Sequence, residues 1–500
     1  MSFRDLIGCI GGFLVSIVLQ RPGASWLTFL GLRPRCVQQS GMLILTDIEP
    51  GKVDALLQKL EEIRSRLIGY RKNKQKISFY NTETVHYAAW MILPGIRNPD
   101  RKQPPGPAKL AFETNHDGSL VCHLNDLADN CQQELDEVYA FCPDYLLSRS
   151  KGQSVAEFLF NKFQQTSKTV VTSAYYVALP GRSLEDIKNA IAVYDEAKNF
   201  VDDPSNKSSD PKELSSALIE HFRTRAQEKP VRFPVTQQRL RHLFAMNLGI
   251  LTLLSLVLLI VLIPMYHWWK GLTSLFEKSM VAVLTSLCLL PLLYFARWLV
   301  INVIARYYED KERRSQEPFD PTYHRPDYRH LDLGPQNHLC TYATVRPGWF
   351  RMYVIRRALW LGPVLFNYFF IMGKLDQMST IHFARWTLIK QQLIFFSNYD
   401  GSWSSYLNDF SDEAWGVNLV WGNTIGFPPT KFIVRRGAHD LERFQAQAAE
   451  HYAPAPVFYS AYRDRPLVNL IRYLEFRDKL LEEMAVSPTR QRINSLLAMI

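Results

Sequence analysis

LAFETNHDGSLVCHLNDLAD, from Leu110 to Asp129, recurs with few changes as LIFFSNYDGSWSSYLNDFSD, from Leu393 to Asp412. Half of the positions are identical, including the central Asp-Gly-Ser and the Leu-Asn-Asp that follows it. A similarity that holds at a fixed offset indicates an internal duplication, which constrains the architecture before any other feature is considered.

The duplication extends beyond these two stretches and keeps its order. Upstream, HYAAWMIL ending at Leu93 matches HFARWTLI ending at Ile389. Downstream, TSAYYVALPGRSLEDI at 172–187 matches YSAYRDRPLVNLI at 459–471. The offset is 283 residues between Leu110 and Leu393 and 297 between Gly51 and Gly348, so insertions and deletions between the copies are small.

One copy has the element order strand, helix, strand, strand, helix, strand. The residue patterns predict strands at 43–48, 86–93, 109–114 and 169–179, and helices beginning near Pro50, Ser119 and Ser183. At the second helix, Asp117 and Gly118 supply a turn and Ser119 a cap. This order is ferredoxin-like, with an antiparallel sheet covered by helices on one face.

We therefore expect an α+β fold in which two ferredoxin-like repeats turn their open sheet faces together as a pseudo-dimeric α/β barrel. A two-helix transmembrane hairpin is expected between the repeats. The expected domains are an N-terminal membrane-associated segment at 1–40, the first repeat at 41–230, the hairpin at 240–306 and the second repeat at 335–486.

The hairpin is predicted from two apolar runs, at 243–266 and 279–304. Each is long enough to cross a hydrocarbon layer of about 30 Å, and the alternative is a pair of buried core helices. Lys and Arg flank the pair on its outer ends, which places both halves in the cytoplasm. The protein is then integral to a membrane, the inner membrane if the source is bacterial.

Two other apolar stretches are ambiguous. Residues 6–19 fit a signal-like segment, an interfacial helix or a capping element. Residues 349–373 fit either a core helix or a helix that docks on a membrane.

Composition excludes some functional classes. Of 500 residues, 47% are apolar and 21% charged, and the net charge of +10 is not gathered into a basic patch for nucleic acid. The seven cysteines form no C-x-x-C pair, which disfavours a disulfide framework or a zinc ribbon and suits a reducing compartment.

The element order and the duplication together resemble a fused, tandem member of the dimeric α/β-barrel superfamily. The pattern SNYDGSW…YLNDF…GFP…YSAY is similar to bacterial membrane proteins of that type. The superfamily includes haem proteins, small monooxygenases and isomerases, so the resemblance implies a haem-dependent or cofactor-free oxidoreductase. The chain carries N-x-D-G where the dye-decolourising peroxidases carry G-x-x-D-G, and it has no other catalytic signature.

Residues kept in both copies favour structural roles. Asp117 and Asp400 fit a turn before a capped helix, or a general acid/base beside a cavity. His86 and His382 fit hydrogen-bonded core residues, or a haem ligand or proton carrier. The polar stretch at 315–338 fits a linker, or a loop metal site through Asp320, His324, Asp327, His330 and Asp332.

Residues that differ between the copies favour function. Arg385 replaces Ala89 in an apolar strand, where a charge needs either a protein carboxylate or an anionic ligand. The loop at 421–430 also differs. We predict a ligand site in the second copy and assign no catalytic residue and no metal ligand. Its residues are His382, Arg385, Asn398, Tyr399, Asp400, Trp403, Trp421, Asn423 and Phe427.

The sequence thus predicts a membrane-anchored protein that binds a small apolar or amphipathic, lipid-derived ligand between two cytoplasmic halves. Its expected partners are the lipid membrane, that ligand and a partner oxidoreductase, and nucleic acid is not among them. The alternative is a non-catalytic membrane scaffold that docks a partner enzyme. A bound haem or lipid supports the first hypothesis, and a filled interior with a large exposed apolar patch supports the second.

Overall fold

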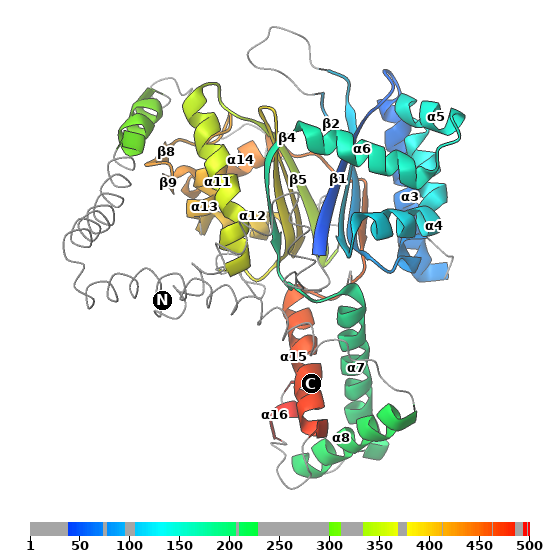
Figure 1. Cartoon of the computed structure of the whole chain (residues 1–500). Coiled ribbons are helices and arrows are strands. Elements are labelled where there is room, and N and C mark those ends of the chain that lie inside the picture. The colour runs from blue at the N-terminus through cyan, green and yellow to red at the C-terminus, as the bar shows by residue number, and fades with distance from the viewer. Residues whose placement is uncertain are drawn as a thin grey trace, which may run out of the picture.

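Two four-stranded sheets lie at the centre of the structure, and helices cover their outer sides (Figure 1). This computed structural model describes residues 39–73, 78–95, 106–206, 210–228, 300–311, 334–368, 378–412, 414–462, 464–485, 494–497 and 499–500. All but the last two residues of the expected segment at 1–40, and most of the loop at 315–338, lie outside these residues.

The two copies have matching elements. The first copy contains β1 (Gln39–Asp47), α3 (Val53–Asn73), β2 (Val85–Leu93), β3 (Lys109–Asp117), α4 (Leu120–Tyr139), α5 (Pro143–Ser150), α6 (Val155–Thr169), β4 (Val170–Val177), α7 (Leu184–Asp202) and α8 (Pro211–Glu228). The second contains β5 (Gln336–Thr344), α11 (Trp349–Tyr368), β6 (Ile381–Ile389), β7 (Gln392–Asp400), α12 (Trp403–Asp412), α13 (Ala414–Trp421), β8 (Thr430–Lys431), β9 (Arg435–Arg436), α14 (Leu441–Glu450), β10 (Val457–Ser460), α15 (Leu467–Ala485) and α16 (Asn494–Leu497).

Strand register is the same in both copies. Gln39 of β1 lies opposite Asp117 of β3, and Gln336 of β5 lies opposite Asp400 of β7. A β-bulge also recurs, between Val85 and Tyr87 in β2 and between Ile381 and Phe383 in β6. A bulge turns one extra side chain toward a chosen face, and the extra residue is a histidine each time.

The two copies exchange their last strands. The order of the first sheet is β1-β3-β2-β10, and that of the second is β4-β6-β7-β5. Strand β10 of the second copy therefore completes the first sheet, and β4 of the first copy completes the second. The expectation of one self-contained sheet per ferredoxin-like repeat is wrong in this respect. The remaining described strands, β8 and β9, pair with each other in a small separate sheet.

Each sheet buries both faces. Side chains alternate along a strand, so Met42 and Ile44 pack under α3 and α4 while Leu43 faces the second sheet. On the second sheet, α11 covers β4, where Gly362 lets the helix approach so closely that an added Cβ would lie 2.6 Å from the Ala174 Cβ. Buried Ile355 and Leu359 belong to the same core, so this face of α11 is a core face.

The transmembrane hairpin is not supported. No helix among the described residues is long and apolar enough to cross a membrane. The run at 243–266 and most of that at 279–304 lie outside the described residues. The described end of the second run belongs to a helix at 300–311, whose Ala305 packs against Phe350 and Ile433. In this helix Ile301 and Ile304 pack partly against the same cluster, whereas Val300 and Val303 are exposed.

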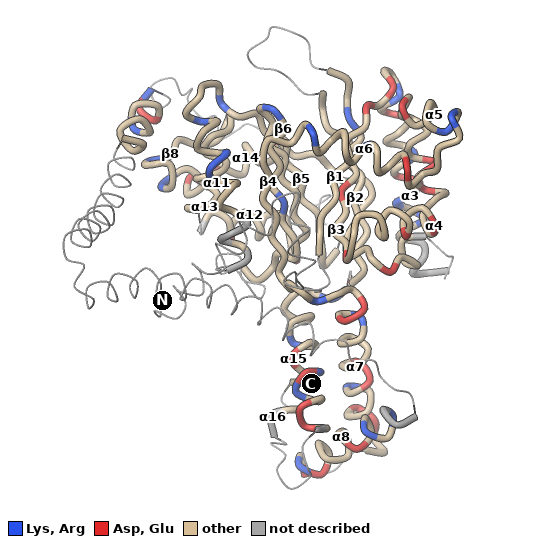
Figure 2. The backbone as a smooth tube through the Cα atoms, viewed as in Figure 1, with Lys and Arg blue, Asp and Glu red and all other residues tan. Residues whose placement is uncertain are grey.

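Helices α7, α8, α15 and α16 project from the sheets as a stalk (Figure 1). Reciprocal ion pairs join α7 and α15, because Arg182 binds Asp478 at 2.8 Å and Arg465 binds Asp195 at 2.7 Å. Arg465 is equivalent to Arg182 and Asp478 to Asp195, since the residues of each set lie 283 positions apart. Figure 2 shows that charged residues lie mainly on the helices, whereas the sheets are largely uncharged.

Candidate functional site

Both copies contain the same joint at the end of the third strand. The Asp117 Oδ1 lies 2.8 Å from the His86 Nε2, and its Oδ2 accepts a hydrogen bond of 2.6 Å from the Leu184 backbone N–H. The corresponding distances at Asp400, to His382 and Leu467, are also 2.8 and 2.6 Å. Each carboxylate thus ties a bulged histidine to the first residue of a stalk helix.

The Gly and Ser of the motif complete this joint. Gly118 and Gly401 have φ of +79° and +86°, a conformation that favours glycine. Ser119 Oγ accepts from the Cys122 N–H and Ser402 Oγ from the Ser405 N–H, both at 3.2 Å. The predicted helix cap is therefore confirmed in both copies, and the contacts of the whole motif are structural ones.

The histidine environment does not fit haem ligation. His86 Nε2 binds Asp117, and its Nδ1 contacts the Tyr462 hydroxyl. His382 Nε2 lies 2.8 Å from Asp400 and 3.0 Å from the Gln336 Nε2. A haem ligand needs one imidazole nitrogen turned toward the iron. Both side chains are buried, and these contacts use both ring nitrogens of His86 and the Nε2 of His382.

Arg385 crosses from the second sheet toward the first. Its guanidinium occupies the space that Gly41 leaves on β1, since a Cβ on Gly41 would lie 1.8 Å from the Arg385 Nη2. The guanidinium carbon also lies 5.2 Å from the centre of the Tyr175 ring, a cation–π contact. Arg385 is only 8% exposed, and it forms no ion pair with any carboxylate in the described part of the chain.

Glu113 is the carboxyl group that interacts electrostatically with Arg385. It is 1% exposed, its Oε1 accepts a 3.0 Å hydrogen bond from the Asn115 Nδ2, and its Oε2 has no hydrogen-bond partner among described residues. Burial raises the pKa of Glu113 to about 7, although Arg385 and Asn115 act to lower it. Near neutral pH this carboxyl can therefore exchange a proton, as general acids and bases do.

An amide pair lies where the copies meet. Asn115 Nδ2 donates to the Oδ1 of Asn398, its counterpart in the second copy, at 2.9 Å. The Tyr175 hydroxyl donates to Asn115 Oδ1, and Asn398 Nδ2 donates to the His338 Nδ1, each at 3.0 Å. The His338 Nε2 has no hydrogen-bond partner in the described ranges, and burial lowers the pKa of His338 to about 3, so the ring is neutral.

On either side of this amide pair, equivalent positions carry different side chains. On one side lie Gly41, Glu113, Tyr175 and Arg385, which we call the charged half. Their counterparts are His338, Phe396, Phe458 and Ala89, which we call the apolar half. The sizes compensate, because large Arg385 faces glycine whereas small Ala89 has a histidine across from it.

The predicted ligand residues do not form one site. His382, Arg385, Asn398 and Asp400 lie between the sheets. Tyr399 stacks on Tyr406 on the outer face of the second sheet, with 4.0 Å between ring centres. The equivalent residues of the first copy, His116 and His123, stack with 3.9 Å between ring centres. Buried Trp403 begins the helix above this face.

The loop at 421–430 lies on that outer face too. Trp421 packs on Phe395 and Trp386, the strand neighbour of Arg385 that points the opposite way. Backbone groups near Asn423 and Phe427 bind Arg346, since Arg346 Nη2 donates to the Phe427 carbonyl at 2.8 Å. Arg385 and this loop therefore lie on opposite faces of the second sheet.

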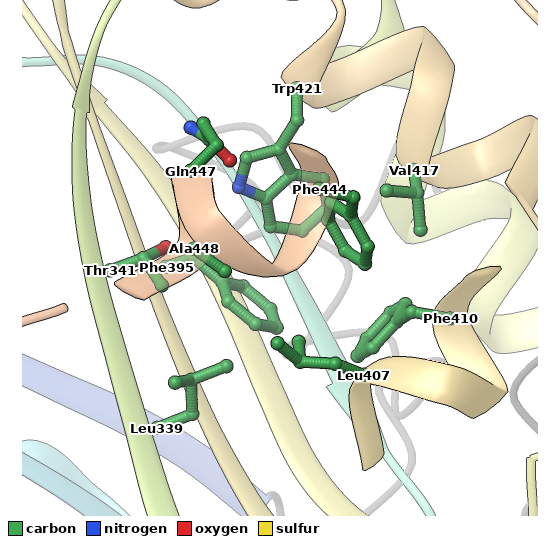
Figure 3. Close-up of a pocket in the computed structure, with 10 residues that line it drawn as sticks. All are labelled: Leu339, Thr341, Phe395, Leu407, Phe410, Val417, Trp421, Phe444, Gln447 and Ala448. Carbon is green, nitrogen blue, oxygen red and sulfur yellow. The ribbon is translucent and has the colours of Figure 1, made fainter. Parts of the chain in front are cut away.

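A small cavity does lie beside Trp421 (Figure 3). Its volume of about 20 Å³ holds roughly one water molecule. Its lining is mostly apolar and comes from the second sheet and from α12, α13 and α14: Leu339, Thr341, Phe395, Leu407, Phe410, Val417, Trp421, Phe444, Gln447 and Ala448. This cavity is too small for a lipid-derived ligand.

Sequence reasoning missed Glu113, Gly41, Tyr175 and His338. A signal for Glu113 was present in the repeated stretch, where this acidic residue of an apolar strand is replaced by Phe396 in the second copy. No family model, curated protein or solved structure matches this chain. The chemistry of the interior is therefore inferred from its own residues.

Proposed function

We propose that the interior between the two sheets binds a small carboxylate-bearing, amphipathic molecule, with Arg385 as the anchor for its carboxylate. The observation that carries this proposal is that Arg385 is a buried guanidinium with no ion-pair partner among the described residues. A buried charge of this kind is costly unless an opposite charge reaches it, and a planar carboxylate fits the guanidinium fork.

The polar atoms around Arg385 support the same conclusion. Glu113 Oε2 and His338 Nε2 are buried without hydrogen-bond partners among described residues. Such atoms are normally satisfied by protein, water or ligand. A ligand lying across the amide pair would meet one polar atom in each half of the interior.

The apolar half supplies the contact for the rest of the ligand. Phe396 and Phe458 are 1% and 5% exposed, and the His338 ring lies 5.6 Å from that of Phe458. The two halves thus match a molecule that is anionic at one end and aromatic or aliphatic at the other.

The test compares benzoate with benzamide, its uncharged analogue of similar shape, on the purified full chain at pH 6. We expect benzoate to bind about tenfold or more tightly, since hydrogen bonds to charged groups contribute about 1.5–3 kcal/mol. Arg385→Met should remove this preference. Arg477→Met is the matched control, because Arg477 is also buried but pairs with Asp186 at 2.5 Å in the stalk.

Isothermal titration calorimetry measures both ligands, and circular dichroism confirms that each variant is folded. The control variant should keep the preference for benzoate. A folded Arg385→Met protein that binds benzoate as tightly as the wild type would refute the assignment.

A further inference from the structure

Glu113 and Arg385 are the charged groups that face each other across the charged half. The neighbours of Glu113 on its own sheet are apolar, with Leu43 opposite on β1 and Ala89 opposite on β2. From the second sheet, Arg385 on β6, Tyr175 on β4 and Cys340 on β5 act electrostatically with it. Burial raises the pKa of both the Tyr175 hydroxyl and the Cys340 thiol, so both stay neutral. Arg385 is thus the one described cation available to Glu113 or to a ligand.

A carboxylate that binds Arg385 competes with Glu113 for this cation. Two carboxylates beside one guanidinium leave an excess negative charge in a buried site, where repulsion is weakly screened. The least costly response is for one carboxyl group to take up a proton. Glu113 is the better placed of the two, because its Oε2 has no hydrogen-bond partner in the described chain.

We infer that binding of the carboxylate ligand is coupled to uptake of one proton from solvent by Glu113 Oε2, so that the ligand exchanges with the Glu113 charge at Arg385. This inference rests on the proposed function, and it adds how the site is regulated. No bond between heavy atoms forms or breaks, and the one new bond is the O–H bond of the Glu113 carboxyl group. One solvent proton adds to the Glu113 carboxylate as the ligand anion enters, and the same proton returns to solvent when the ligand leaves.

The sign of the pH dependence follows. The pKa of Glu113 is raised to about 7, so the neutral form that admits the ligand prevails at pH 6 and the charged form at pH 8. Because the apparent dissociation constant rises as the competent fraction falls, affinity should weaken by about tenfold from pH 6 to pH 8. Binding is favoured by acid and release by base.

The experiment is calorimetric titration of the full chain with benzoate, at pH 6 in phosphate and in Bis-Tris and at pH 8 in phosphate and in Tris, because the two buffers of each pair differ in ionisation enthalpy. The difference between buffers gives the number of protons taken up per benzoate bound. We expect close to one at pH 8 and close to zero at pH 6. Glu113→Gln mimics the protonated acid, so it should take up no proton and bind equally at both pH values.

Glu134→Gln is the matched control, because Glu134 is also buried but lies on α4 outside the first sheet, and its uptake should equal that of the wild type. Benzoate binding without proton uptake at either pH would overturn the coupling and leave the proposed function intact. Uptake that persists in Glu113→Gln would also overturn it. Failure of benzoate to bind at any pH would overturn the proposed function, and the coupling with it. If Glu113→Gln does not fold, the wild-type comparison alone decides.

Discussion

The stretches that end at Asp117 and Asp400 make the same contacts at their ends, yet four residues upstream one carries Glu113 and the other Phe396. At the ends, each carboxylate holds a histidine and a helix N–H at matching distances. Upstream, the same strand position gives a titratable acid in one copy and an aromatic ring in the other.

This difference separates two kinds of constraint. The joint at the strand end satisfies a backbone N–H and orients a stalk helix, so both copies need it. The interior needs only complementary volume, which Arg385 against Gly41 and Ala89 against His338 both supply. Chemistry can therefore change on one side of the amide pair while the fold is preserved.

The largest expected effect on stability comes from removing the positive charge of Arg385 from the charged half. Arg385→Met should lower the free energy of unfolding by about 3–5 kcal/mol at pH 8, because Glu113 then lacks its counter-charge. The loss should be smaller at pH 6, where Glu113 is mostly protonated because its pKa is about 7. Urea denaturation at the two pH values measures it.

The double variant Glu113→Gln/Arg385→Met is its control. It should recover much of the stability lost at pH 8. Equal losses at both pH values, or no recovery in the double variant, would show that charge does not distinguish the two halves.

A smaller effect should come from the glycine that faces Arg385. Gly41→Ala places a Cβ 1.8 Å from the present Nη2 position, and the resulting overpacking should cost about 1–3 kcal/mol. The same change in an Arg385→Ala background should cost little, because the space is then open. Thermal denaturation of the four proteins tests this, and an equal cost in both backgrounds would contradict the size compensation.

The smallest effect is expected in the stalk, where the copies remain alike. Arg465→Ala removes one of the reciprocal ion pairs and should cost about 1 kcal/mol or less, because its pair with Asp195 is partly exposed. Arg182→Ala should cost more, because Arg182 also pairs with buried Asp186 at 3.2 Å. Chemical denaturation of both variants sharpens the comparison. An equal loss in both variants would show that the additional pair with Asp186 does not distinguish the two copies in the stalk.

The sequence predicted those features that local patterns determine. The duplication, the strand and helix order and the caps at Ser119 and Ser402 follow from periodicity and turn chemistry. The strand exchange does not follow, because the alternating patterns of β4 and β10 specify a buried face and not which sheet edge they join. The transmembrane hairpin was predicted from hydropathy alone, and no helix in the described part of the chain is long and apolar enough to support it.

The site was predicted only in part. Arg385 was identified from its contrast with Ala89, but Glu113 was overlooked because function was sought in the second copy alone. Once strands are exchanged, residues of both copies line each half of the interior. Trp421 was assigned to the same site as Arg385, but it packs on Trp386. Trp386 is the next residue along the strand, so its side chain points to the opposite face from that of Arg385.

The exchange of strands also determines when each strand can pair during synthesis. Strand β4 ends at Val177 and β6 begins at Ile381, so β4 leaves the ribosome about 200 residues before its partner exists, an interval of about 10–40 s at typical elongation rates. Throughout that time β4 is unpaired, and the edge of β2 remains open until β10 emerges still later. A chain that has already made β6 can then pair with β4 of a chain behind it on the same messenger, and such pairing would give entangled dimers or aggregates in place of the intramolecular sheets.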